Sequence, residues 1–138
     1  MSDCVASARE TAHQKGVALE EALRPVGPLL ADRERLSQVV GNVLNNAIRF
    51  TPAGGEVRVR LREEGRRAVL TVTDTGAGIP ADLLPRIFEP GMRHADSEGF
   101  GLGLTIAKDI VEHHGGTISA HSDGQGRGAS FTIVLPVA

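Results

Sequence analysis

Asn42, Asn46 and Arg49 are the residues whose types and spacing first point to chemistry in this chain of 138 residues. They lie four and three positions apart, so an α-helix aligns their side chains along one stripe. Asparagine is a mediocre helix former because its short amide competes for the backbone, and Asn45 adds a third within five residues. We therefore expect some compensation for keeping them there. A merely asparagine-rich polar face is the alternative.

A second candidate, Asp74-Thr75-Gly76-Ala77-Gly78, follows a strand pattern. A carboxylate at a strand end can accept a hydrogen bond from an exocyclic amine, which favours adenine over guanine. Gly76 and Gly78 allow the backbone to turn sharply and to lie close against a flat ligand. Taken alone, the motif is more readily explained as an ordinary turn, where Asp and Gly are common.

A third candidate is the run Gly99-Phe100-Gly101-Leu102-Gly103-Leu104, in which glycines alternate ahead of a helix. Unhindered N–H groups at a helix N-terminus form an anion site, and the helix dipole favours phosphate there. The run lacks the spaced lysine of a Walker loop and does not match G-x-G-x-x-G. A flexible hinge is the alternative, and both interpretations fit a lid before a phosphate-binding segment.

One long helix must carry the asparagines. Its apolar residues recur at i, i+3, i+4, i+7, i+8 and i+11, which predicts a helix with one buried face. Asp32 is the expected N-cap, and Thr51-Pro52 with Gly54-Gly55 ends the helix. The apolar stripe consists of Leu36, Val39, Val40, Val43, Leu44 and Ala47.

The other segments predict an α+β order. Residues 57–62 alternate strictly between apolar residues and arginine, so we expect a strand whose arginines face solvent rather than form a docking patch. Gly65 turns the chain into a second strand, and Gly115-Gly116 ends the last helix. Hairpins with helices beside them predict a mixed sheet covered by helices on one face. The remaining expected elements are helices over residues 2–14, 81–88 and 102–114, and strands over residues 17–23, 68–73, 117–121 and 129–135.

Composition bounds the possible functions. Hydrophobic residues make up 41% and charged residues 23%, which is ordinary for one globular domain, although aromatic residues reach only 3%. The net charge of -2 gives no basic field for nucleic acid. A single cysteine, Cys4, excludes an internal disulfide and suits a reducing compartment. No apolar run approaches a membrane span, so we expect a cytoplasmic domain without membrane contact, which is compatible with a membrane-anchored parent protein.

Four ordered motifs run through the chain: Asn42-x-x-x-Asn46-Ala47-x-Arg49-Phe50-Thr51-Pro52, Asp74-x-Gly76-x-Gly78-Ile79-Pro80, Ile87-Phe88-Glu89-Pro90 and Gly99-x-Gly101-Leu102-Gly103-Leu104. Their order and spacing resemble the ATP-binding catalytic domain of bacterial sensor histidine kinases, within the GHKL superfamily. The resemblance extends from about Gly16 onward. It implies a Bergerat-type ATP-binding fold, a two-layer α/β sandwich with a mixed, mostly antiparallel sheet.

The resemblance implies a role for each matching position. Asn46 would bind Mg²⁺ through its amide oxygen, with Asn42 beside it contacting metal, water or phosphate, and this suits an ion that takes few protein oxygens alongside a triphosphate. Asp74 would bind the adenine amine, and Arg49 would face the phosphates. The other implied nucleotide-binding residues are Phe50 as a wall, Gly76 and Gly78 shaping the adenine pocket, Ile79 lining it, Gly101 and Gly103 cradling phosphates, Gly99 as the lid hinge, and Phe88, Leu102 and Leu104 from the same motifs.

The implied reaction is transfer rather than hydrolysis. Related hydrolases, the gyrase, mismatch-repair and chaperone ATPases, carry a Glu where this chain has Asn42, and that Glu activates water. An amide cannot act as a general base at neutral pH. ATP should therefore be held for γ-phosphoryl transfer, by positioning and by charge neutralisation from Mg²⁺ and Arg49. Asn42, Asn46 and Arg49 are the expected catalytic residues.

The implied acceptor is a histidine on a dimeric helical hairpin, and none of the five histidines here matches its pattern. We therefore expect residues 1–15 to be a helical segment or linker from a missing dimerisation hairpin, and residues 16–138 to be the ATP-binding catalytic domain. The fragment should be a monomer that binds ATP and does not autophosphorylate. The implied partners are that dimerisation and phosphoacceptor domain and a response regulator of a two-component pathway.

Departures from the family pattern keep two other functions open. Gly91 stands where the family often has an aromatic residue, and Phe100 replaces a smaller one in a short lid. One alternative is a serine-directed kinase of the same superfamily, of the anti-sigma-factor type. The other is a degenerate nucleotide-sensing or docking module, against which the intact Asn46 and Asp74 argue.

Overall fold

The computed structural model of the chain describes residues 2–24, 27, 32–89 and 103–137. Its elements in chain order are α1 (Ser2–Lys15), β1 (Ala18–Leu23), α2 (Arg33–Arg49), β2 (Glu56–Glu64), β3 (Arg67–Asp74), a 3-10 helix η1 (Leu84–Arg86), α3 (Gly103–His113), β4 (Thr117–His121) and β5 (Ala129–Pro136).

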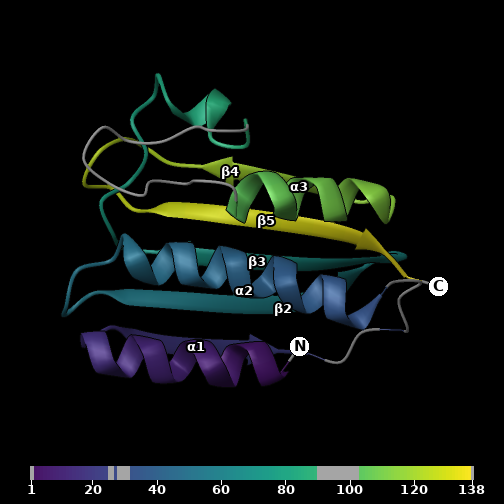
Figure 1. Cartoon of the computed structure of the whole chain (residues 1–138), viewed down its shortest axis with the longest axis horizontal. Helices are drawn as coiled ribbons and strands as arrows, with labels where there is room; N and C mark the ends of the chain where they lie inside the picture. Colours follow the sequence, from purple (N-terminus) through teal and green to yellow (C-terminus); the bar gives the residue numbers. More distant parts are fainter. Residues whose placement is uncertain (1, 25–26, 28–31, 90–102, 138) are drawn as a thin grey trace.

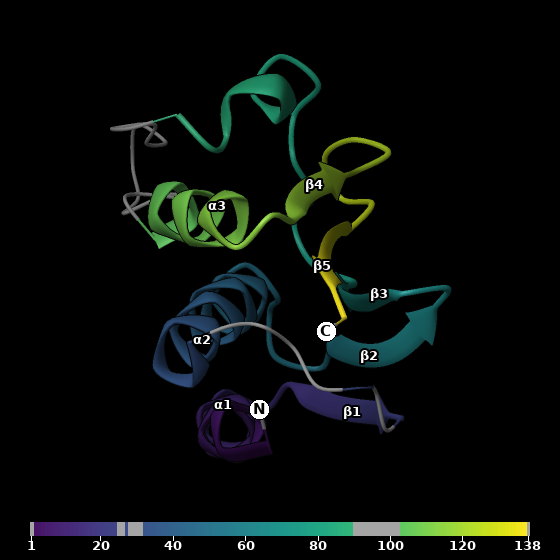
Figure 2. The ribbon, with the colours of Figure 1, turned by 90° about the vertical axis from the view of Figure 1, so that its right-hand side faces the viewer.

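The strands of the described residues form one five-stranded sheet in the order β1-β2-β3-β5-β4. Strand β1 runs parallel to β2, and the other neighbours are antiparallel. Figure 1 shows the three α-helices in front of the sheet, and Figure 2 shows them as a layer on one face. The predicted α+β sandwich is confirmed. None of the helices in the described part of the chain combines the length and apolar character that a bilayer crossing needs.

Helix α2 lies at the centre of the helical layer, and its sequence explains why. The predicted cap is present: the Asp32 carboxylate accepts hydrogen bonds from the backbone N–H groups of Glu34 at 2.9 Å and Arg35 at 3.3 Å. These bonds satisfy two of the N–H groups that a helix start leaves unpaired. The predicted apolar stripe faces the sheet, with Leu36 partly buried and Val39, Val40, Val43, Leu44 and Ala47 buried.

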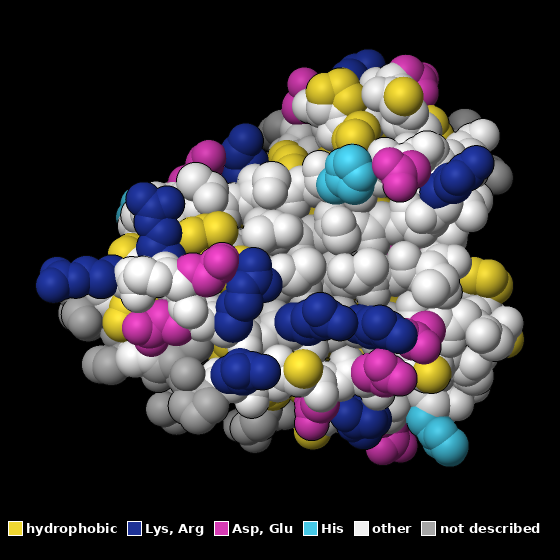
Figure 3. All heavy atoms as spheres, turned by 180° about the vertical axis from the view of Figure 1, so that it is seen from behind, with side chains coloured by type: hydrophobic (Ala, Val, Ile, Leu, Met, Phe, Trp, Pro, Cys, Tyr) yellow, Lys and Arg dark blue, Asp and Glu magenta, His cyan; other side chains and the backbone are white. Residues whose placement is uncertain are grey.

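Strand β2 shows the predicted alternation, with its valines and Leu61 buried and its arginines exposed. Its outer face is the side of the sheet that the helices leave open, and Figure 3 shows Lys and Arg side chains gathered across that side. Arg58 pairs with Glu56 and Glu20, and Arg62 pairs with Glu64. These exposed pairs fit the expected solvated face.

Helix α1 packs into the core instead of standing apart from it. Val5, Ala8 and Ala12 are buried in the same apolar cluster as the α2 stripe. At its end, the Lys15 ammonium donates to the backbone carbonyls of Ile48 at 2.9 Å and Arg49 at 2.7 Å. A cation at the C-terminus of α2 satisfies unpaired carbonyls and complements the helix dipole. The division of the chain at residues 15 and 16 stays a prediction, but α1 shares one apolar core with the rest of the domain.

The helix predicted over residues 81–88 is wrong in type and length. Residues 81–83 form turns, and only Leu84–Arg86 is helical, as a 3-10 helix. Proline explains the difference, because Pro85 has no N–H to donate and its ring crowds the carbonyl of the preceding turn. Most of the backbone bonds here are of the shorter type, as from the Arg86 N–H to the Leu83 carbonyl, and a single longer bond runs from the Leu84 N–H to the Pro80 carbonyl.

The cap of α2 gives a first prediction. Asp32→Ala should lower the free energy of unfolding by about 1 kcal/mol, because two backbone N–H groups lose their acceptor. Asp32→Asn is the matched control, since its amide oxygen can accept the same bonds, and it should stay close to the parent chain. Urea denaturation with an unchanged slope measures both variants. Equal losses in the two would show that the cap does not stabilise the helix.

Candidate functional site

The polar stripe of α2 passes from the interior to the surface. Asn46 is 8% exposed, Asn42 is half-buried and Arg49 is exposed. Asn46 is buried because it adjoins Ala47 on the stripe that faces the sheet. Its Nδ2 has no hydrogen-bond partner among the described residues, although a buried amide without one is costly. The side chain therefore has hydrogen-bonding capacity that a ligand can satisfy.

Asp74 lies on the buried face of the sheet because of strand parity. It ends β3 two positions after Val72 and four after Leu70, both buried, so its side chain also points beneath the helices. Its Oδ1 accepts a hydrogen bond from the Gly76 N–H at 2.8 Å. Burial raises the pKa of the Asp74 carboxyl above its ordinary value, and the backbone N–H groups of Gly76 and Ala129 partly oppose that rise. A carboxylate this costly to bury is characteristic of functional sites.

Asn46 and Asp74 line one cavity between α2, β3 and β5. The cavity measures about 10 Å³, room for a single water, whereas small-molecule pockets are typically roughly 300–1,000 Å³. A larger ligand would have to move part of the wall. Five of the lining residues, Asn46, Phe50, Asp74, Gly78 and Ile79, were predicted from the sequence, whereas Ala47, Ala129 and Phe131 were missed.

The missed residues Ala129 and Phe131 reach the cavity through the strand register. Asp74 pairs with Ala129, and Val72 pairs with Phe131, so these inward side chains share rows of the sheet. The alternation of β5 shows which of its residues face inward. It contains no signal for which residue of β3 each one meets, so only the structure reveals the neighbours of Asp74.

The glycines after Asp74 are required by the protein's own backbone. A Cβ on Gly76 would lie 2.2 Å from the carbonyl oxygen of Phe50, and one on Gly78 would lie 2.1 Å from that of Gly124. Gly78 also has φ of +74°, which favours glycine. The segment thus runs between the end of α2 and the β4–β5 loop. Contact of these glycines with a flat ligand stays a prediction.

The start of α3 adjoins the same side of α2. The Asn42 amide donates through Nδ2 to the Gly103 carbonyl at 3.0 Å, which ties the two helices together. Leu104 is buried beneath this junction. Of the predicted phosphate run, Gly103 and Leu104 are therefore near Asn42, while Gly99, Gly101 and Leu102 lie outside the described residues, as do Gly91 and Phe100 of the predicted lid.

Phe88 is held between α3 and the sheet. The Thr105 hydroxyl donates to the Phe88 carbonyl at 3.0 Å, and the Phe88 ring meets the Phe131 ring edge to face with centroids 6.3 Å apart. Phe131 lines the cavity, and Phe88 packs against the Phe131 ring without lining the cavity itself. Phe88 therefore supports the site from outside.

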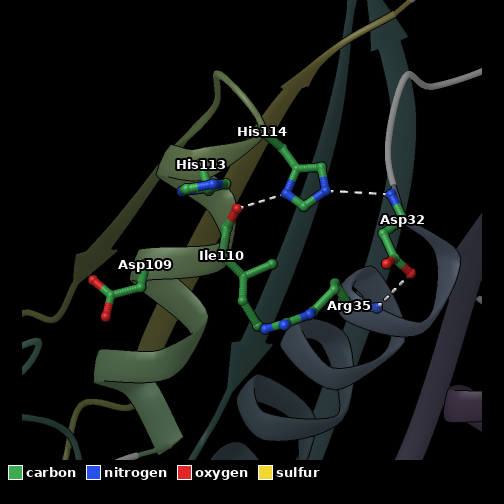
Figure 4. A pocket seen from close by; sticks show the side chains of 6 residues that line it. All are labelled: Asp32, Arg35, Asp109, Ile110, His113 and His114. Carbon is green, nitrogen blue, oxygen red and sulfur yellow. Dashed lines mark hydrogen bonds between the residues drawn. The ribbon is translucent and has the colours of Figure 1, made fainter.

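A second cavity, of about 400 Å³, lies at the opposite ends of α2 and α3. Figure 4 shows its junction: His114 Nδ1 lies 2.7 Å from the Ile110 carbonyl, and its Nε2 accepts from the Asp32 N–H at 3.2 Å. Arg35 to Asn46 is eleven residues of helix, roughly 16 Å. The candidate site is the smaller cavity, because the larger one contains no buried unpartnered group among the described residues. The larger cavity is lined by Asp32, Arg35, Asp109, Ile110, His113 and His114.

The described residues contain no group of three His, Cys, Asp or Glu side chains placed to hold a metal ion. A metal ligated mainly by protein carboxylates does not fit here. An ion that keeps most of its waters and takes one or two protein oxygens does fit, since the Asn46 amide is buried without a partner on its nitrogen. Metal ligation by Asn46 and Asn42 stays a prediction.

Comparison with known proteins matches residues 31–138 to the family described as histidine kinase-, DNA gyrase B-, and HSP90-like ATPase. The sensor histidine kinase Hik2 of Thermosynechococcus vestitus is 39% identical over 138 positions, which cover 96% of this chain and 36% of Hik2. The chain thus spans about a third of that relative's length.

Solved structures agree with the sequence comparison. The mycobacterial sensor histidine kinase MprB superposes with a TM-score of 0.84 at 33% identity, covering 99% of this chain and 95% of that one. Full-length ShkA in complex with AMPPNP superposes with a TM-score of 0.81, also at 33% identity, covering 99% of this chain and 30% of ShkA. The fold resembles that of histidine kinase catalytic domains.

The buried carboxylate gives a second prediction. Because the pKa of Asp74 is raised from 3.8 in the folded state, its contribution to stability is greatest at acid pH and is lost as the pH rises through the raised value. Asp74→Asn removes this loss and can still accept the Gly76 bond. The free energy of unfolding of the variant should therefore exceed that of the parent by an amount that grows as the pH rises from 3.8 to the raised pKa. Above the raised pKa the difference should stay constant.

Urea denaturation at a series of pH values measures this difference. Repeating it in 1 M salt is the control, since salt screens pairwise charge interactions and leaves the cost of burial nearly unchanged. Stability curves that run parallel at all pH values would contradict burial as the cause.

Proposed function

The chain belongs to the family of histidine kinase-, DNA gyrase B- and HSP90-like ATPases, and from this premise we propose that it is the ATP-binding catalytic domain of a two-component sensor histidine kinase. In this proposal it binds Mg-ATP and transfers the γ-phosphoryl group to a histidine on a separate dimerisation and phosphoacceptor domain. The observation that carries the proposal is the meeting of Asn46 and Asp74 in one cavity. The matched ShkA structure holds AMPPNP, a triphosphate analogue of ATP.

Asp74 is the proposed recognition group for the base. Ionised, its carboxylate has acceptor positions beyond those used by Gly76, and an exocyclic amine can donate to one of them. The low polarity around it, from Ile79, Ala129 and Phe131, strengthens such a bond and excludes competing water. A guanine would present a carbonyl oxygen to the carboxylate instead, so the site favours adenine.

Asn46 and Asn42 are the proposed groups on the metal side. The oxygen of the Asn46 amide is a suitable Mg²⁺ ligand, and its unpartnered Nδ2 can donate to a phosphate oxygen. The Asn42 amide is oriented by its bond to Gly103. When bound, Mg²⁺ supplies charge neutralisation along the triphosphate. Arg49, exposed at the end of α2, adds positive charge on the same side.

The lining of the cavity favours transfer over hydrolysis. Asp74 is the only titratable side chain among the described residues that line it, and its carboxylate is assigned to the base. An amide cannot take a proton from water, so neither Asn42 nor Asn46 can act as the general base. Transfer forms an N–P bond at a histidine ring nitrogen, breaks the bond from the γ-phosphorus to the bridging oxygen that leaves with ADP, and releases the ring proton to solvent.

A histidine is the proposed acceptor because Hik2 and MprB are both named as sensor histidine kinases. The serine-directed and degenerate alternatives gain no specific support from the cavity. The chain spans about a third of Hik2, so the acceptor domain and a response regulator are proposed partners elsewhere in the pathway. We place the domain in the cytoplasm, where ATP and such partners are available.

The site assignment gives a third prediction. Asn46→Asp puts a second carboxylate into the cavity of Asp74 and removes the Nδ2 donor, so affinity for Mg-ATP should fall about tenfold or more. Asp74→Asn should weaken binding similarly, because its amide cannot replace both acceptors. Asn45→Asp adds the same charge at an exposed neighbouring position and is the matched control. Calorimetric titration measures each, and unchanged affinity in both site variants would refute the assignment.

The reaction gives a fourth prediction. The chain alone, incubated with γ-labelled Mg-ATP, should take up no acid-labile label, because none of its five histidines matches the acceptor pattern. A cognate dimerisation hairpin added in trans should become labelled on histidine, and the label should be stable to alkali. Stable labelling of the chain itself, or a hairpin that stays unlabelled while ATP binds, would contradict transfer to a separate histidine.

A further inference from the structure

The loop between β4 and β5 braces the segment that follows Asp74. We call residues 122–128 the brace. It contains Ser122 and three glycines with positive φ, Gly124, Gly126 and Gly128. In the sequence these glycines indicate only a hairpin loop. The structure places the brace directly against residues 76–79, which form the proposed adenine-binding segment.

The Ser122 hydroxyl is the centre of the brace. Its oxygen accepts hydrogen bonds from the N–H groups of Ile79 at 2.9 Å and Gly124 at 3.3 Å, and its proton is donated to the Gly128 carbonyl at 2.7 Å. A hydroxyl has one donor and two acceptor positions, so this arrangement uses all of them. One side chain thereby joins the two ends of the brace to Ile79.

Backbone contacts extend the same junction. The Gly126 N–H donates to the Ala77 carbonyl at 2.6 Å, and the Gly128 N–H donates to the Gly76 carbonyl at 3.1 Å. A Cβ on Gly128 would lie 2.2 Å from the carbonyl oxygen of Asp74. The brace therefore follows the segment from its first residue to Ile79, and at Gly128 the approach is too close for any residue with a Cβ.

We propose that Ser122 is a positioning residue of the nucleotide site, which fixes Ile79 and the preceding glycine segment where the adenine ring must pack. The inference rests on the proposed function. Ile79 is 2% exposed and lines the cavity, so its N–H depends on the Ser122 hydroxyl for a hydrogen-bond partner. The segment would then have to shift to satisfy that group, and Ile79 would move with it.

The effect should be confined to the base. Within the described residues, all hydrogen bonds of the Ser122 hydroxyl go to Ile79 and to the brace itself. The proposed metal and phosphate groups, Asn42 and Asn46, are on α2, on another wall of the site. Loss of the hydroxyl should therefore weaken ligands that contain adenosine and leave the binding of a bare triphosphate unchanged.

The test is Ser122→Ala in the full chain, titrated with Mg-ADP, adenosine and magnesium tripolyphosphate. Affinity for Mg-ADP and adenosine should fall about tenfold, the size expected when one buried N–H loses its partner, while tripolyphosphate binds as before. Amide hydrogen exchange at Ile79 should accelerate in the same variant. Equal adenosine affinity in parent and variant, or an equal loss for all three ligands, would overturn the positioning role.

Three controls separate positioning from folding. Ser122→Thr keeps the hydroxyl and should restore adenosine affinity. Ser119→Ala removes a hydroxyl from an exposed position on β4 and should change nothing. Ile133→Val removes one buried methylene group from the core, which lowers stability, but it lies outside the cavity lining and should leave affinity intact.

If Ser122→Ala does not fold, Ser122→Cys fills similar space with weaker hydrogen bonding and should show the same selective loss of adenosine affinity. A parent chain that binds none of the three ligands would overturn the proposed function and the inference with it. A parent that binds adenosine no better than Ser122→Ala does would overturn the inference alone.

Discussion

The burial of the Asp74 carboxylate is the constraint around which this end of the molecule is built. Strand parity directs it beneath the helices, where its charged form is poorly solvated, and the N–H groups of Gly76 and Ala129 only partly compensate. The Gly76 N–H is available because the backbone folds back tightly after β3, which requires glycine at Gly76 and Gly78, and the Ala129 N–H comes from the paired strand β5. Burial of the Asp74 carboxylate costs stability, so its presence is better explained by ligand recognition than by a contribution to folding.

Periodicity is what made most of the fold predictable. The apolar stripe of α2 and the alternation of β2 each repeat over enough residues to exclude other structures, and Asp32 marks the start of α2 through ordinary cap chemistry. The candidate site was predictable where its residues belong to contiguous motifs, as with Asn46 and Asp74, which the structure brings into one cavity. Residues 90–102, which include much of the predicted lid, lie outside the part of the chain that the structure describes.

The features that the sequence did not reveal depend on contacts between distant segments. Ala129 and Phe131 meet the site through strand register, Lys15 reaches across to the end of α2, and Ser122 supports Ile79 from a different hairpin. A pattern within one segment cannot show which residues of a distant segment it will contact. The helix expected over residues 81–88 failed for a local reason, because Pro85 cannot donate the backbone hydrogen bond that an α-helix needs there.

The scarcity of aromatic residues has a spectroscopic consequence. The chain has no Trp or Tyr and only four phenylalanines, and the three that the structure describes gather at one place: Phe50 and Phe131 line the cavity, and Phe88 packs on Phe131. Elsewhere the described core is aliphatic, so it contributes no benzyl resonances. Fluorinated phenylalanine incorporated throughout the chain would thus place three of its four labels within or beside the candidate site, without any engineered reporter.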